Sequence, residues 1–264
     1  MTSWLLAALR SFTWPAMVLL AAWLLTLLTM PFRARKGGAR AETQSIIAGV
    51  VLQVATVTAI LLSDWPPLQV GGTVAGVLIL SWLAEFVGSH TGFPFGRYAY
   101  TRRLQPQLGQ VPVLIPFAWL MMLPPAWAIG GAIAGAYHGL AFVLASSLAF
   151  TAWDLFLDPQ MVAWGMWIWQ GSDRKRSRRR SGYFGIPWSN YAGWLGVSAL
   201  ITWAWSVLVP QQTLPREALT LIYALTWGME TFAQLVFWHL PGPALSGALG
   251  MGICLLLAAL GAPW

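Results

Sequence analysis

The residues of this sequence with the clearest chemical potential are two aspartates, Asp154 and Asp158, in the segment WDLFLDPQMV. They close a long apolar run, and Pro159 follows directly. In a helix, residues four apart lie on one face and one turn from each other, so the two carboxyl groups are expected to be neighbours. Carboxyl groups are costly to keep in membrane-type sequence, and this pair therefore predicts a functional site.

The chemistry open to such a pair is proton transfer. A carboxylic acid in apolar surroundings keeps its proton at neutral pH, and two close carboxyl groups can share one proton. Such an acid can protonate an alkene, and aromatic faces favour the carbocation that forms. A Trp-rich segment and the compact segment YFGIPWSN, which ends in Asn190, follow the aspartates. A Ser-His-Asp arrangement, a phosphate-binding glycine loop and a zinc-ligand spacing are absent from the sequence.

The composition shows what kind of scaffold must hold these acids. Of the 264 residues, 58% are hydrophobic and 9% are charged, and the mean hydropathy is +0.64. Soluble domains carry about 25% charged residues, so these values predict an integral membrane protein. The single Cys254 excludes an internal disulfide and a Cys-rich metal site. The net charge of +7 is clustered beside apolar runs, which indicates topology signals rather than nucleic-acid binding.

Eight apolar runs predict an all-α, polytopic membrane helix bundle that forms one domain over residues 1–264. The runs cover residues 12–30, 43–63, 69–88, 111–134, 137–157, 191–209, 218–240 and 244–262. Prolines interrupt the fourth run most densely, at Pro112, Pro116, Pro124 and Pro125. Because each proline frees a backbone carbonyl that needs another partner, we expect broken helices around an intramembrane pocket.

The basic residues orient these spans. All of the 15 Lys and Arg residues except Arg10 and Arg216 lie in the loops after the first, third and fifth runs. The chain is therefore expected to be a multi-pass protein of the cytoplasmic membrane. By the positive-inside rule, these loops are cytoplasmic and both termini lie on the outer side of the membrane. Polar groups from four spans then fall near one depth, as a single site requires: Glu85, Asp154, Asp158, Asn190 and His239, with Glu230 deeper in the seventh span.

The acids also have structural interpretations. Asp158 can be a helix-end carboxylate at the level of the lipid headgroups, where charge is inexpensive. Glu85 can pair with Arg97 in the following loop. Glu230 lies in the middle of its run among apolar residues and has no comparable structural explanation.

The other polar and aromatic residues have structural interpretations as well. His138 and His239 are typical of structural histidines, and the basic run 174–180 is expected to face lipid phosphates. Residues 161–169 are too short to cross a membrane and are expected to lie at its interface. Interface anchoring is the expected role of their tryptophans, Trp164, Trp167 and Trp169, with substrate entry as a secondary role.

Four segments resemble those of a known family: EFVGSHTGFPFGRYAY, VPVLIPFAWLMMLPPAW, AWDLFLDPQMV and GYFGIPWSNYAGW. On these segments, from the third to the sixth run, the sequence resembles the membrane carotenoid 1,2-hydratases, which include γ-carotene 1′,2′-hydratases and bisanhydrobacterioruberin hydratases. The resemblance implies addition of water across the terminal C1–C2 double bond of an acyclic carotenoid end group. The product is a tertiary 1-hydroxy end. The implied partners are a lycopene- or γ-carotene-type substrate from the bilayer, water and membrane lipids, with no cofactor.

This activity gives each candidate residue a hypothetical role. Asp154 or Asp158 protonates C2. The partner carboxylate, Glu85 or Glu230 activates a water that Asn190 orients. Aromatic side chains shield the cation at C1, and the candidates are Trp153, Tyr183 and Trp188. Further contacts with the substrate are expected from Tyr98, Trp119 and His239.

Three other functions stay open. The spacing of Asp154 and Asp158 resembles half of the aspartate-rich signature of membrane prenyltransferases, which bind Mg²⁺-diphosphate, but a second such motif is missing. A carotenoid cyclase would use the same protonation and then lose a proton instead of adding water. Buried acids and interrupted helices also occur in proton-coupled transporters, but no inverted repeat is visible.

The predicted orientation can be tested by cysteine labelling in a Cys254→Ser background. A Ser177→Cys variant is expected to react with reagents on the cytoplasmic side, because position 177 lies in the most basic loop. A Gln211→Cys variant is expected to react only with external reagents. Labelling of position 177 from outside would overturn the orientation.

Overall fold

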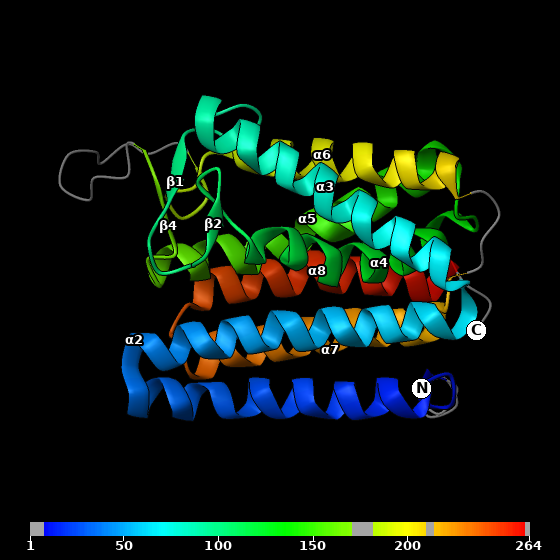
Figure 1. Ribbon diagram of the computed structural model, residues 1–264, viewed down its shortest axis with the longest axis horizontal. Helices are drawn as coiled ribbons and strands as arrows, with labels where there is room; N and C mark the ends of the chain where they lie inside the picture. The colour runs from blue at the N-terminus through cyan, green and yellow to red at the C-terminus, as the bar shows by residue number, and fades with distance from the viewer. Residues whose placement is uncertain (1–7, 171–181, 210–213, 262–264) are drawn as a thin grey trace.

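The computed structural model describes residues 8–170, 182–209 and 214–261, and shows a bundle of long helices that run along the long axis of the molecule (Figure 1). Within this part, six helices are long and apolar enough to cross a membrane. They are α2 (Trp14–Asp64), α3 (Pro67–Thr91), α4 (Leu114–Ala134), α5 (Gly139–Ala163), α6 (Trp188–Leu208) and α8 (Pro241–Gly261). The all-α polytopic bundle predicted from the sequence is confirmed.

Helix α2 forms a hairpin of two antiparallel arms (Figure 1). As a straight helix its 51 residues would be roughly 76 Å long, more than twice the hydrocarbon thickness of a membrane. The backbone leaves helical geometry at Gly38, with φ 59° and ψ −152°, a conformation that glycine adopts because it has no Cβ. The chain reverses there, and the two arms correspond to the first two predicted spans.

Helix α7 (Arg216–Val236) completes the bundle beside the second arm of α2 (Figure 1). It has the same length as α8 but is less apolar, because it carries Arg216, Glu217 and Glu230. It packs mainly against α8 and α4. With the two arms of α2 counted separately, the helices follow the predicted order of eight spans.

Helix α4 is the central helix of the bundle. Within its most apolar window, 78% of residues are buried inside the protein, compared with 28% for α3 and α8. The helix continues through Pro124 and Pro125, which remove hydrogen bonds to carbonyls four residues earlier. One of these carbonyls, that of Met121, accepts a hydrogen bond from the Gln53 side chain of α2 at 3.4 Å. A neighbouring helix thus provides the partner that the sequence required.

Helix α5 also continues through a proline. The sequence predicted that this span ends at residue 157, but the helix runs past Pro159 to Ala163. Pro159 leaves the Leu155 carbonyl without its helical donor, and the Tyr183 hydroxyl donates to that carbonyl at 3.0 Å. The predicted boundary was wrong because this donor comes from a residue distant in the sequence. As a result, Asp154 and Asp158 lie well inside the helix.

Two small antiparallel sheets cover one end of the bundle (Figure 1). In the first, β1 (Tyr98–Tyr100) pairs with β4 (Trp167–Trp169), so that Tyr98 faces Trp169 and Tyr100 faces Trp167. In the second, β2 (Gln107–Leu108) pairs with β3 (Val111–Pro112). The segment 161–169, which the sequence predicts at the membrane interface, consists of the end of α5, a turn and β4.

Two of the basic loops lie at one end of the bundle. The start of α2 and the end of α8 lie at the opposite end, and the turn of the α2 hairpin lies at the same end as β1 and β4 (Figure 1). The basic clusters 33–40 and 97–103 therefore share one end, as the predicted topology requires. The run 174–180 and the labelling positions 177 and 211 lie outside the described residues.

The role of Tyr183 in bridging the proline in α5 can be tested by a double-mutant cycle. The Tyr183→Phe variant is expected to lose about 1 kcal/mol of stability, because the Leu155 carbonyl loses its donor. In a Pro159→Ala background the loss should be close to zero, because alanine has a backbone N–H that can reach that carbonyl. Thermal unfolding in detergent measures both. Equal losses in the two backgrounds would contradict this role.

Candidate active site

The two aspartates of α5 are bridged by one side chain from α6. The Asn190 amide nitrogen donates to Asp154 Oδ2 at 2.8 Å and to Asp158 Oδ2 at 2.5 Å. All three side chains are buried, with Asp154 0%, Asp158 2% and Asn190 2% exposed. One face of α5 and the first turn of α6 therefore hold the predicted carboxyl pair around a single neutral donor.

The sheet of β1 and β4 supplies further donors to Asp158. The indole nitrogens of Trp167 and Trp169 donate to Asp158 Oδ1 at 2.5 Å and 3.3 Å. Alternate residues of a strand lie on one face, so the order Trp-Ile-Trp directs both indoles inward and leaves Ile168 55% exposed. The interpretation of Asp158 as a headgroup-level carboxylate is wrong, as is that of Trp167 and Trp169 as interface anchors.

Glu85, near the end of α3, is held by three neutral donors. Its Oε2 accepts from the hydroxyls of Tyr98 and Tyr100, the latter at 2.8 Å, and its Oε1 accepts from the Trp119 indole at 3.1 Å. Burial and the neighbouring Glu85 raise the pKa of the Tyr98 and Tyr100 phenols, so both remain protonated donors. The expected pairing of Glu85 with Arg97 is not formed.

Glu85 and Asp158 line one small cavity from different helices. Its volume is about 30 Å³, which is enough for a water molecule. Aromatic rings form much of its wall: Phe95, Tyr98, Tyr100, Trp119, Trp167, Trp169 and Trp194. Within the described part of the chain, no Lys, Arg or His forms an ion pair with Glu85, Asp154 or Asp158. We call this space the inner cavity.

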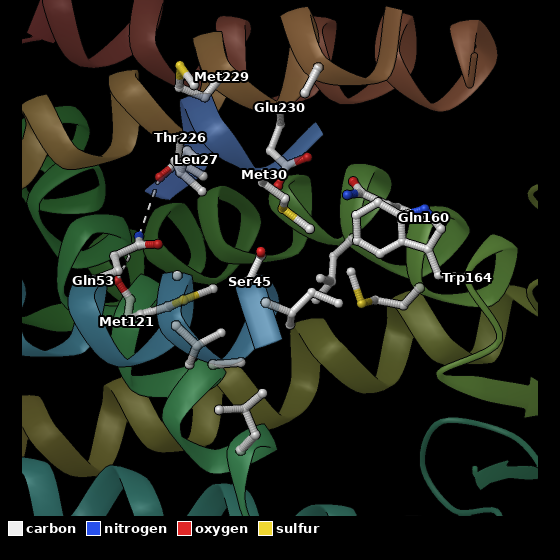
Figure 2. Close-up of a pocket in the computed structure, with 18 of the residues that line it drawn as sticks. Leu27, Met30, Ser45, Gln53, Met121, Gln160, Trp164, Thr226, Met229 and Glu230 are labelled. Atoms are coloured by element: carbon white, nitrogen blue, oxygen red, sulfur yellow. Dashed lines mark hydrogen bonds between the residues drawn. The ribbon is translucent and has the colours of Figure 1, made fainter. Parts of the chain in front are cut away.

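A larger cavity adjoins the inner one, between α2, α4, α5 and α7 (Figure 2). Its volume is about 130 Å³ and its walls are mostly apolar. The two cavities share four lining residues, Ile115, Ala118, Leu157 and Trp167. Glu230 and Gln160 reach this larger cavity and do not line the inner one. We call it the outer cavity.

The structure brings most, but not all, of the predicted site residues together. Trp153 lines the outer cavity and contacts Trp194 edge-on, with ring centroids 6.0 Å apart. Tyr183 lines neither cavity, and its hydroxyl donates to the Leu155 carbonyl of α5. Trp188 is 60% exposed, because two residues along a helix turn a side chain about 200° away from Asn190. His239 is exposed in the turn after α7, outside both cavities.

Three donors and two aromatic wall residues were not selected from the sequence as site residues: Tyr100, Trp167, Trp169, Phe95 and Trp194. A signal for the first three is present in the alternation of Tyr-Ala-Tyr and Trp-Ile-Trp, which is typical of short strands with one buried face. It was missed because each run has only three residues. Trp194 follows Asn190 by one helical turn and so faces the same side.

The fold and the site define a multi-pass membrane protein with buried carboxyl groups beside an apolar cavity. Residues 43–257 match the model of the family described as carotenoid biosynthesis protein, and the chain belongs to this family. The matched region contains Glu85, Asp154, Asp158, Asn190 and Glu230.

A curated relative adds a more specific similarity. The chain is 33% identical over 133 residues to a bisanhydrobacterioruberin hydratase of Haloarcula japonica. The alignment covers 48% of this chain and 41% of the relative, so less than half of either protein is compared. No solved structure is significantly similar to the chain.

The bridging role of Asn190 leads to a stability prediction. The Asn190→Leu variant is expected to lose roughly 1–3 kcal/mol, because two buried carboxyl groups lose their shared donor. An Asp158→Asn background should lessen the loss, because the new amide can donate to Asp154. Unfolding in detergent measures the effect, with the exposed Gln44→Leu as the control. A stability equal to that of the control would argue against the bridge.

Proposed function

We propose that this protein is a carotenoid hydratase, which adds water across the terminal C1–C2 double bond of an acyclic carotenoid end group. Membership of a carotenoid biosynthesis family supports the substrate class, and the name of the Haloarcula relative supports the reaction. The observation that carries the proposal is the inner cavity, where two carboxyl groups from different helices face a space the size of one water molecule.

Asp158 is the proposed acid. It lines the inner cavity, whereas Asp154 does not, and the two carboxyl groups share one amide donor. Two such groups without a cation are best accommodated with a proton between them. Asp158 transfers its proton to C2 as the C1–C2 π bond breaks, which leaves a tertiary cation at C1. Asp154 acts as a positioning residue through Asn190.

The cation at C1 is stabilised by aromatic faces. Trp119 and Trp194 stack with centroids 4.8 Å apart and line the inner cavity together with the indoles of β4. Aromatic rings attract cations through their quadrupole. They also exclude bulk water, which would otherwise compete with the substrate's double bond for the proton of the acid. The wall thus favours the cation without adding a second nucleophile.

Glu85 is the proposed base. It accepts hydrogen bonds from two phenols and one indole, which is an arrangement suited to a carboxylate. Water in the inner cavity forms a C–O bond to C1 and gives one proton to Glu85. Return of that proton to Asp158 restores the starting state, so the net reaction consumes one water and no other reagent.

The outer cavity is the proposed path of the end group. It is apolar, it adjoins the inner cavity through Leu157 and Trp167, and it is bounded by the α2 hairpin and α7. Its volume of about 130 Å³ holds only the end of a long chain, so the rest of the polyene stays in the bilayer. This accounts for a reaction at the terminal double bond rather than inside the chain.

The other functions that the sequence left open differ in their products. A cyclase would give a product of unchanged mass, whereas hydration adds the mass of one water. A prenyltransferase would need Mg²⁺, whereas the proposed reaction uses no metal or redox cofactor and should persist with chelator. A transporter would leave the carotenoid unmodified.

The acid and base roles predict the loss of turnover in Asp158→Asn and Glu85→Gln. Each variant keeps the size of the side chain but removes the transferable proton or its acceptor, so conversion should fall about 10²–10⁴-fold. Asp154→Asn should lose less, because Asp154 does not face the cavity. The assay is conversion of lycopene or γ-carotene per folded enzyme in H₂¹⁸O, which marks oxygen taken from solvent.

The matched control is Glu217→Gln, because Glu217 pairs with Arg216 away from both cavities. It should convert substrate at the wild-type rate. Wild-type ¹⁸O incorporation by folded Asp158→Asn and Glu85→Gln would refute the assigned chemistry. A wild-type protein that converts no acyclic carotenoid would refute the function itself.

A further inference from the structure

The outer cavity contains a polar group that the proposed reaction does not use. Its non-aromatic polar lining residues are Ser45, Gln53, Gln160, Thr226 and Glu230. Three of them are bonded within the bundle. Ser45 donates to the Ala41 carbonyl, Thr226 donates to the Ile222 carbonyl, and Gln53 donates to Met121 and Thr226. The side chains of Gln160 and Glu230 are bonded within the bundle only in part, and each keeps a polar atom for a ligand.

Glu230 and Gln160 belong to one cluster with Gln234. The Gln234 amide nitrogen donates to Gln160 Oε1 at 2.6 Å, to the Phe156 carbonyl at 3.1 Å and to Glu230 Oε2 at 3.4 Å. In the described part of the chain, Glu230 Oε1 has no hydrogen-bond donor and Gln160 Nε2 has no acceptor. Figure 2 shows Glu230 directed from α7 toward the centre of the cavity, with Gln160 beside it.

This cluster is close to the reaction site along α5. Gln160 and Leu157 are three residues apart on one helix face, about one turn or 5 Å along the axis. Leu157 belongs to the wall shared with the inner cavity and directly precedes Asp158. An end group that withdraws from the inner cavity by about one helical turn therefore arrives beside Gln160 and Glu230.

The chemistry of the cluster selects a neutral hydroxyl group. The described lining of the outer cavity contains no Lys, Arg or His, so it does not suit a phosphate or a carboxylate. A hydroxyl can donate to Glu230 Oε1 and accept from Gln160 Nε2, which pairs both available atoms. A hydrocarbon end would leave both atoms unpaired in an apolar space, which is unfavourable.

We propose that the outer cavity is a binding site for the hydroxylated end of an acyclic isoprenoid chain, with Glu230 and Gln160 as its hydrogen-bond partners. The inference rests on the proposed function, because the tertiary alcohol is the product formed one turn away. The cluster holds the new hydroxyl as it leaves the inner cavity and so draws the product away from the acid. Glu230 is a product-binding residue and not the base that activates water.

The test compares the binding of lycopene and its 1-hydroxy derivative to purified protein in detergent micelles. Quenching of tryptophan fluorescence reports binding, because Trp23, Trp153, Trp164 and Trp167 line the cavity. The wild type is expected to bind the alcohol about tenfold more tightly than the hydrocarbon. Glu230→Leu should reduce this ratio to about one, and Glu230→Gln should retain part of it, because an amide still bonds to a hydroxyl.

A second variant and a matched control make the test independent of folding defects. Gln160→Leu should lower the ratio on its own, and Glu217→Leu, on the same helix but outside the cavity, should leave it unchanged. No preference for the alcohol in the wild type, or an unchanged ratio in folded Glu230→Leu and Gln160→Leu, overturns the proposal.

The outcome is separable from that of the proposed function, because binding is measured without turnover. The inactive Asp158→Asn variant should keep the wild-type preference for the alcohol. If the preference depends on Glu230 but no carotenoid is hydrated, the binding site stands and the proposed reaction fails. If hydration is confirmed but Glu230→Leu leaves the preference intact, the reaction stands and the binding site fails.

Discussion

Three carboxyl groups are buried without a basic partner among the described residues, and the arrangement of the elements around them depends on how these groups are hydrogen-bonded. Glu85, Asp154 and Asp158 lie inside an apolar bundle, and in the described part of the chain no basic side chain pairs with them. A buried carboxyl group that lacks hydrogen bonds is strongly destabilising. Neutral donors therefore have to be brought to the site from several elements: Tyr98, Tyr100, Trp119, Trp167, Trp169 and Asn190.

This requirement explains why a helical membrane protein carries a small β-sheet at one end. Among the helices, the second turn of α4 and the first turn of α6 place donors near the acids, through Trp119 and Asn190. The strands β1 and β4 present alternate side chains to one face and so deliver two phenols and two indoles together.

Acidic groups of the protein interior line two different cavities. The inner cavity combines Asp158 and Glu85 with aromatic walls, and the outer cavity combines apolar walls with Glu230. Both cavities lie beside helices that continue through their prolines, and two of the freed carbonyls, those of Met121 and Leu155, accept hydrogen bonds from Gln53 and Tyr183. At these two positions a side chain from another element thus replaces the missing backbone donor.

The sequence by itself determined the membrane class, the order of the spans and the proximity of Asp154 to Asp158, because hydropathy and helical spacing are local properties. Only the tertiary structure decided which polar groups share a cavity. Glu85 joins Asp158 there, while Glu230 faces a separate space and Trp188 and His239 point outward. The donors of β4 and the bridging of Pro159 by Tyr183 depend on contacts between residues distant along the chain. Such contacts are set by the packing of helices and strands, which no local pattern encodes.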